Sequence, residues 1–85
     1  MFNLHNWTWA EDVTIATYVI NRKTDKKSVY KLCGILGLKE GKVSYRMSNF
    51  EQLYKGEYKG RHYSRQEREV LEWLTSRNGL NIKPL

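Results

Sequence analysis

The chain has 85 residues, a net charge of +6 and an aromatic share of 13%. That length suits one domain with a single core, and it leaves too little chain for a deep substrate cavity, which argues against an independent enzyme. No apolar run approaches the roughly 20 residues of a membrane span, so we expect neither a span nor a signal peptide. The single cysteine, Cys33, excludes an internal disulfide, and we expect a cytoplasmic protein in which Cys33 is a small buried side chain.

The first predicted helix begins after Thr8 and runs to about Asn21. Thr8 and Glu11 have the spacing of a capping box, and Asp12 adds a favourable negative charge near the positive helix end. Trp7 precedes the cap, where it can pack back onto the helix. The residues expected in the core are Ile15, Val19 and part of Tyr18, with Trp7 or Trp9 closing one end.

A polar, basic break separates this helix from the next, and Thr24 or Asp25 can cap the second helix. Apolar residues then recur at i, i+3, i+4 and i+7 from Val29 to Leu36, which predicts an amphipathic helix. Gly37 follows, at a position where helices commonly end in the left-handed conformation. A helix that ends in Gly, a short turn and a second amphipathic helix together indicate a helix-turn-helix.

The second helix of this pair is predicted over residues 40–52, and its two sides differ in chemistry. At about 100° per residue, Val43, Met47 and Phe50 fall on one side. The other side carries polar groups that suit base edges, and the alternative is an ordinary amphipathic helix with a solvated face. The predicted base-edge contacts are Lys42, Tyr45, Ser48, Asn49 and Gln52, with Arg46 on the flank.

Positive charge is concentrated in the middle of the chain. Residues 22–65 contain twelve Lys or Arg against four Asp or Glu, whereas residues 1–21 carry −2 and residues 66–85 are balanced. A polyanion is the simplest partner, and no helix combines a broad apolar face with a lysine-rich one, so nucleic acid fits better than a membrane surface. An acidic protein surface remains the alternative. The predicted phosphate contacts are Lys26, Lys27, Lys31, Lys39, Lys55, Lys59 and Arg61.

Residues 54–63 contain Tyr-Lys-Gly twice, which predicts either a loop or a short β-hairpin that would form a basic wing. The two histidines and the cysteine lie far apart in sequence and do not fit a zinc site. We therefore expect neither a metal nor another cofactor, and a solvated His62.

The last predicted helix spans residues 64–77 and begins with a second capping box, formed by Ser64 and Glu67. Asn78-Gly79 would end it. Its charges alternate in sign, so Glu67, Glu69 and Glu72 are expected in surface ion pairs. This pattern favours a packing or dimerisation helix over a DNA-reading one.

Two stretches resemble known families. Trp7-Thr8-x-x-Glu11-Asp12 resembles the opening of Myb/SANT-like DNA-binding repeats, although their later, regularly spaced tryptophans are absent. The segment Leu32–Leu53 resembles the helix-turn-helix that precedes many bacterial HNH nuclease domains, but His62 lacks the second His and the Asn of an HNH signature. The second resemblance implies a recognition part without the nuclease, with Arg46 and Asn49 at matched positions. Asn49 could instead brace the helix end.

The sequence thus predicts an all-α fold in one domain. It comprises a three-helix DNA-binding unit over residues 1–53, the loop or wing over 54–63, and a C-terminal helix with its tail over 64–85. The expected function is double-stranded DNA binding by a transcriptional regulator of a phage or other mobile element, with a homodimer through the last helix if the site is palindromic.

The alternative function is an inhibitor or adaptor that binds a host nucleic-acid-handling or defence protein. Exposed aromatic side chains would then anchor the partner, because Trp and Tyr dominate interface hot spots. The expected anchors are Trp9, Tyr45, Tyr58, Tyr63 and Trp73. No catalytic constellation stands at usable spacing, so we expect no enzymatic activity.

Overall fold

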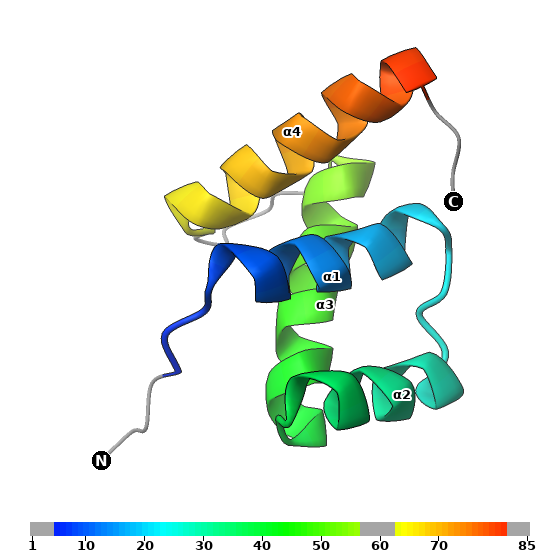
Figure 1. The fold of residues 1–85 in the computed structure, drawn as a ribbon, viewed down its shortest axis with the longest axis vertical. Helices are drawn as coiled ribbons and strands as arrows, with labels where there is room; N and C mark the ends of the chain where they lie inside the picture. The colour runs from blue at the N-terminus through cyan, green and yellow to red at the C-terminus, as the bar shows by residue number, and fades with distance from the viewer. Residues whose placement is uncertain (1–4, 57–62, 82–85) are drawn as a thin grey trace.

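Four α-helices make up the regular structure of the described residues, 5–56 and 63–81, in this computed structural model (Figure 1). In chain order they are α1 (Trp9–Ile20), α2 (Lys26–Leu36), α3 (Glu40–Lys55) and α4 (Arg65–Asn81). Side chains are described up to Ser76. α1 crosses α3, α2 packs beside the N-terminal end of α3, and α4 contacts both α1 and α3 at the opposite end (Figure 1). The predicted all-α fold is confirmed.

Both predicted capping boxes are present. The Thr8 side chain accepts a hydrogen bond of 3.1 Å from the Glu11 amide, and the Glu11 carboxylate accepts one of 3.0 Å from the Thr8 amide. At the start of α4, the Ser64 hydroxyl and the Glu67 carboxylate form the same reciprocal pair, at 3.1 and 2.8 Å. These bonds satisfy amides that have no partner within the helix, which explains where α1 and α4 begin.

The connection between α2 and α3 is a three-residue turn. Asp25 caps the start of α2 by accepting a bond from the Ser28 amide. At the other end Gly37 has φ 69°, a left-handed conformation that glycine adopts without strain, and its amide donates to the Cys33 carbonyl at 2.8 Å. α3 then starts at Glu40. The predicted helix-turn-helix arrangement is therefore present.

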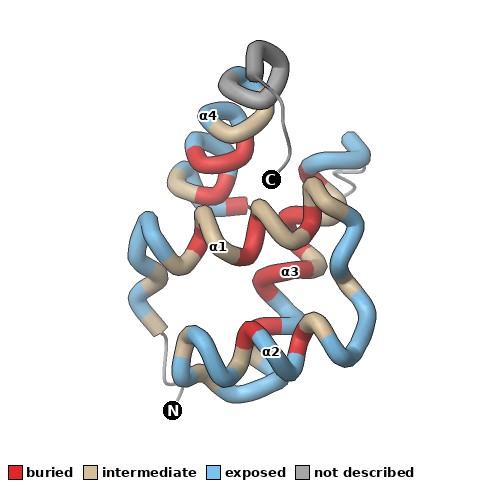
Figure 2. Tube along the Cα trace, turned by 45° about the vertical axis from the view of Figure 1, so that its right-hand side comes forward, coloured by how far each residue is buried: buried red, intermediate tan, exposed pale blue. Residues whose placement is uncertain are grey.

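The core lies where the inner sides of the four helices meet, and the outer side of α2 is exposed (Figure 2). Phe50 at the middle of α3 is fully buried, and Trp7 packs against the core while Trp9 is 40% exposed. Trp7 is therefore the residue that closes this end. The buried apolar residues are Ile15, Ala16, Val19, Val29, Leu32, Val43, Met47, Phe50, Leu53, Tyr63, Val70 and Leu71.

Two predicted boundaries are wrong. α3 continues through Lys55 and ends at Gly56 with φ 77°, so residues 54–55 of the predicted loop or wing are helical. α4 continues to Asn81, beyond the predicted stop at Asn78-Gly79, since a glycine inside a helix costs only about 1 kcal/mol. The rest of the proposed wing, at 57–62, lies outside the described residues. Among the described helices, none is long and apolar enough to cross a membrane.

Candidate nucleic-acid interface

The outward side of α3 differs from the predicted one. Tyr45 is 60% exposed, and Lys42, Ser48 and Gln52 are partly exposed. Two predicted base-edge contacts, Arg46 and Asn49, are instead buried. The other residues of α3 that are exposed at least in part are Glu40, Gly41, Ser44, Glu51, Tyr54 and Lys55.

Arg46 joins three helices in the interior of the protein. Its Nε and Nη2 atoms donate to the two carboxylate oxygens of Asp12 on α1, both at 2.8 Å. Its Nη1 lies 3.3 Å from a carboxylate oxygen of Glu67 on α4, and its guanidinium stacks over the Trp7 ring at 4.8 Å. The prediction that Arg46 contacts DNA is therefore wrong, because its donors are committed to buried carboxylates.

Asn49 belongs to the same buried network. Its amide nitrogen donates to Glu67 at 2.9 Å, so Asn49 braces α4 instead of facing a base. Gln66 completes the network by donating to Asp12 and to the Trp7 carbonyl. The expectation of a surface ion pair for Glu67 is also wrong, since its side chain is 1% exposed. Every buried polar side-chain atom of the described residues has a hydrogen-bond partner.

A periodicity signal for these buried charges exists in the sequence. Each charged residue occupies the first position of an i, i+3, i+4, i+7 set that faces the core. The three sets are Asp12 with Ile15, Ala16 and Val19; Arg46 with Asn49, Phe50 and Leu53; and Glu67 with Val70, Leu71 and Leu74. A charged or amide residue that shares the i, i+3, i+4, i+7 spacing of the apolar residues around it is therefore a sequence signal for a buried polar network.

Two further polar residues of α3, Ser48 and Gln52, are oriented by hydrogen bonds. The Tyr63 hydroxyl donates to the side-chain carbonyl of Gln52 at 2.9 Å, and the Gln52 amide nitrogen lies 3.4 Å from the Ser48 hydroxyl. Tyr63 is buried, and its hydroxyl holds the Gln52 side chain in place. It is therefore not the exposed anchor that the sequence predicted. Tyr45 lies one turn before Ser48 and is the most exposed large hydrophobic side chain of the molecule's described part.

The N-terminal end of α3 is a candidate contact for an anion. Its cap residue, Lys39, makes no side-chain cap hydrogen bond, and the Cα of Gly41 faces open space. The positive end of the helix dipole favours a phosphate here, although Glu40 places a negative charge in the same turn. A surface hollow at this position is lined by Gly37, Leu38, Lys39, Gly41 and Lys42.

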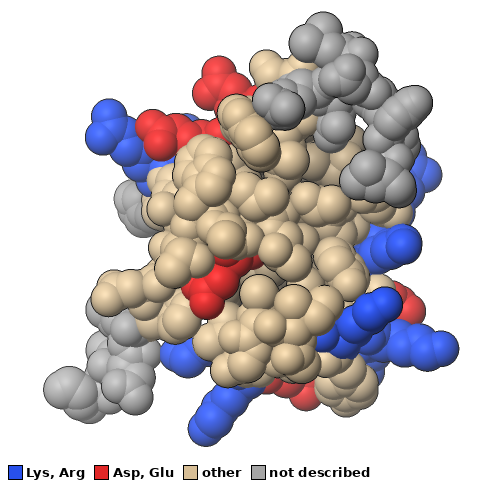
Figure 3. Space-filling model, in the orientation of Figure 1, with Lys and Arg blue, Asp and Glu red and all other residues tan. Residues whose placement is uncertain are grey.

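The exposed side of α2 is basic and aromatic. Tyr30 is 54% exposed, and Lys26, Lys27 and Lys31 are exposed around it. Lys and Arg gather around the lower part of the molecule, while the centre of the face over α1 is mostly uncharged (Figure 3). Between α1 and α2 a second hollow is lined by Tyr18, Lys23, Asp25, Lys27, Ser28 and Lys31.

The structure does not bring all the predicted phosphate contacts together. Lys26, Lys27 and Lys31 lie within about 8 Å of one another along the axis of α2, whereas Lys39 follows the C-terminal end of that helix. Lys55 is exposed about 24 Å further along the axis of α3. Lys59 and Arg61 lie outside the described residues, as does Tyr58. The clustered set is therefore Lys26, Lys27 and Lys31 on α2.

Comparisons of the chain with protein-family models, with curated protein sequences and with solved structures find no match. The resemblances to Myb/SANT-like repeats and to HNH-associated segments remain predictions. Within the described part of the chain, no group of three or more His, Cys, Asp or Glu side chains is arranged to hold a metal ion.

Proposed function

We propose that this protein binds double-stranded DNA through α2, the following turn and the N-terminal half of α3. The observation that carries the proposal is the exposure of Tyr45 in the N-terminal half of α3, the helix whose first turn has no side-chain cap. α4 covers Asn49, which lies one helical turn after Tyr45 on α3, and leaves Tyr45 itself exposed. An exposed helix face beside clustered lysines suits the major groove and its flanking phosphates.

Two groups of residues divide the work in this proposal. The clustered lysines would bind phosphates and set the register of the protein on the duplex, while the polar side chains of α3 would contact base edges. No arginine or asparagine remains among the base-reading side chains, because Arg46 and Asn49 are buried. We therefore expect backbone electrostatics to dominate the affinity, with moderate discrimination between sequences. The proposed base contacts are Lys42, Tyr45, Ser48 and Gln52.

The biological role that we propose for this binding is transcriptional regulation by occupancy of a DNA site. A fold does not determine a function, so the proposed regulatory role depends on the proposed DNA binding and not on the helix-turn-helix fold alone.

The salt dependence of binding to a fluorescent duplex tests the proposal. If roughly five phosphates are neutralised, log affinity should fall against log salt with a slope of about −4.5. The double substitution Lys27→Ala/Lys31→Ala should reduce that slope by about 2 and weaken binding to every duplex alike. The matched control is Arg65→Ala/Arg68→Ala on α4, which removes the same charge and should leave the slope near that of the native protein. An absence of binding at low salt, or equal effects of the two variants, would contradict the proposal.

A further inference from the structure

Two tryptophans from different helices form an exposed aromatic pair. Trp9 on α1 and Trp73 on α4 meet edge to face, with ring centroids 6.0 Å apart and an interplanar angle of 67°. Their exposed fractions are 40% and 42%. Tryptophan is enriched at protein interfaces because its large ring buries much apolar area with little loss of side-chain freedom.

The exposed side of α4 beside this pair carries charges in a self-complementary order. Arg65 and Arg68 precede Glu69 and Glu72, and all four side chains are exposed. In an antiparallel pair of identical helices centred between residues 68 and 69, each arginine faces a glutamate of the other copy. A parallel pair in register would instead oppose like charges. The order of charges on α4 therefore selects an antiparallel, two-fold arrangement.

The intrahelical ion pair of this face does not prevent such pairing. The Arg65 Nε lies 3.4 Å from a Glu69 carboxylate oxygen, and the two side chains are 88% and 54% exposed. A pair this exposed contributes little by itself, so the guanidinium is available to a second carboxylate. Arg65 could thus contact its own Glu69 and Glu72 of the partner subunit together.

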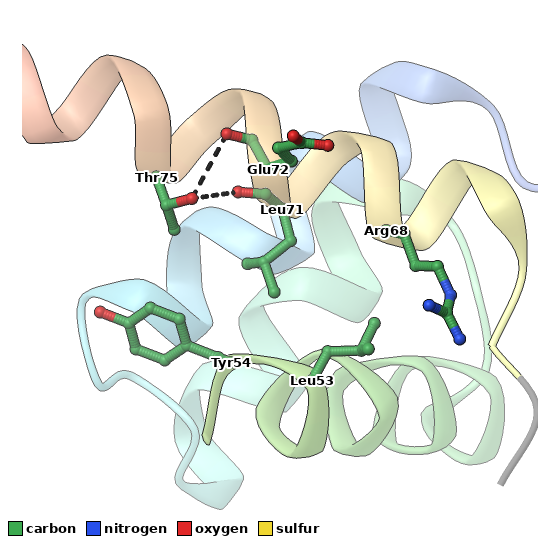
Figure 4. A pocket seen from close by; sticks show the side chains of 6 residues that line it. All are labelled: Leu53, Tyr54, Arg68, Leu71, Glu72 and Thr75. Atoms are coloured by element: carbon green, nitrogen blue, oxygen red, sulfur yellow. Dashed lines mark hydrogen bonds between the residues drawn. The ribbon is translucent and has the colours of Figure 1, made fainter. Parts of the chain in front are cut away.

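A groove with an apolar floor runs along the other flank of α4 (Figure 4). Leu53 and Leu71 point toward one another at its floor, and Tyr54 forms one wall. Arg68 and Glu72 also line this groove. The charged side of α4 therefore lies between the tryptophan pair and an apolar groove. Both offer apolar surface that a partner can bury, which the charged side chains alone do not.

We infer that two copies of this chain associate through α4 in an antiparallel, two-fold arrangement in which each arginine pair faces the glutamate pair of the other copy. Each copy contributes one Trp9–Trp73 pair, so that one pair lies at each end of the contact. The interface is small, so the dimer is weak and depends on concentration. α2 lies at the opposite end of the molecule from α4, so this contact leaves the lysines of α2 uncovered (Figure 1).

Sedimentation equilibrium without DNA tests this inference independently of the proposed function. From about 10 µM to about 1 mM chain, a range that covers weak interfaces, the mean mass should rise from that of one 10.1 kDa chain toward twice that value. The variants Arg65→Glu/Arg68→Glu and Glu69→Arg/Glu72→Arg should each stay monomeric, because four like charges then face four like charges. An equimolar mixture of the two variants should restore the dimer mass.

The matched control is Lys26→Glu/Lys31→Glu on α2, which changes the net charge as the arginine variant does and should dimerise like the native chain. Circular dichroism establishes that each variant remains helical. The substitution Trp73→Ala should weaken the dimer at least tenfold. A native chain that stays monomeric to about 1 mM would overturn the inference. A native dimer that both charge variants retain, or a mixture that stays monomeric, would overturn it equally.

Discussion

The guanidinium of Arg46 on α3 donates two parallel hydrogen bonds of 2.8 Å to the carboxylate of Asp12 on α1, 34 residues away in the chain. The same guanidinium lies 3.3 Å from Glu67 on α4. One arginine thus joins three helices and balances part of the charge of two buried carboxylates. Asn49 and Gln66 supply the further hydrogen bonds that two carboxylates need in a dry environment.

Removal of Arg46 should therefore destabilise the fold severely. In Arg46→Met both Asp12 and Glu67 would be buried without a cation, and we expect the free energy of unfolding to fall by about 3–5 kcal/mol. Urea denaturation measures the loss. Arg65→Met is the control, since Arg65 is exposed and its replacement should change stability by no more than about 0.5 kcal/mol. Equal stabilities of the two variants would show that the network contributes nothing.

Tyr45 and Asn49 should separate DNA contact from folding. Tyr45→Ala should leave the unfolding transition unchanged and weaken binding to a preferred duplex by about 1–3 kcal/mol, with Tyr45→Phe isolating the hydroxyl. Asn49→Ala should lower stability by about 1–3 kcal/mol because Glu67 loses a buried donor. Its discrimination between duplexes should match that of the native protein at temperatures where the variant is folded. A reversal of these two phenotypes would restore Asn49 as a base contact.

Substitutions at two residues with positive φ, each at the end of a helix, should change the stability of the fold in opposite directions. Arg22 has φ 61° and is the one non-glycine residue with positive φ in the described part of the chain, while Gly37 has φ 69°. Arg22→Gly should raise the free energy of unfolding by about 0.5–1 kcal/mol, and Gly37→Ala should lower it by about 1 kcal/mol. A Cβ at Gly37 would meet no atom within 4 Å, so the cost there is conformational. Thermal melts of both variants decide this, and a loss of stability in Arg22→Gly would contradict it.

Two carboxylates that accept helix-capping bonds should make stability fall in acid. Burial tends to raise the pKa of Glu11, but bonds from the Thr8 amide and from His5 outweigh it and hold the pKa below the ordinary 4.5. The Ser28 hydroxyl and amide hold the pKa of Asp25 below 3.8. A lowered pKa in the folded state means stability that is complete above the unfolded pKa and lost as pH falls through the folded one.

The free energy of unfolding should therefore decrease as pH drops below 4.5, the ordinary Glu11 value. Glu11→Gln keeps the geometry of a capping box and removes the titration, so its stability should decline less steeply over the same range. Denaturation at a series of pH values compares the two slopes. Parallel curves for the native protein and for Glu11→Gln would exclude Glu11 as a contributor.

The helix boundaries that follow from neighbouring residues could be predicted from the sequence. The capping box of Thr8 and Glu11 joins residues three apart, and the left-handed turn at Gly37 depends on that residue alone. The end of α3 was harder to predict, because Tyr54 and Lys55 continue the helix until Gly56 stops it. These helix ends depend on residues that are close in sequence, so they can be predicted without knowledge of how the helices pack.

The composition of the candidate site could be predicted only in part, because the partners of its charged residues are distant in sequence. Asp12 lies 34 residues from Arg46, and Asn49 lies 18 from Glu67. A polar side chain on the border of an apolar stripe faces solvent or the core depending on what packs over it. α4 provides that cover for Asn49 and not for Tyr45, which is why one prediction failed and the other side chain is exposed.

Amide chemical-shift mapping during titration with a DNA duplex tests the central claim most directly. We predict that the largest changes in a ¹H–¹⁵N spectrum fall on residues 26–31 and 39–48, and that the helix interiors of α1 and α4 change little. Unchanged spectra at low salt, or shifts concentrated on the Trp9–Trp73 face, would contradict DNA binding through α2 and α3.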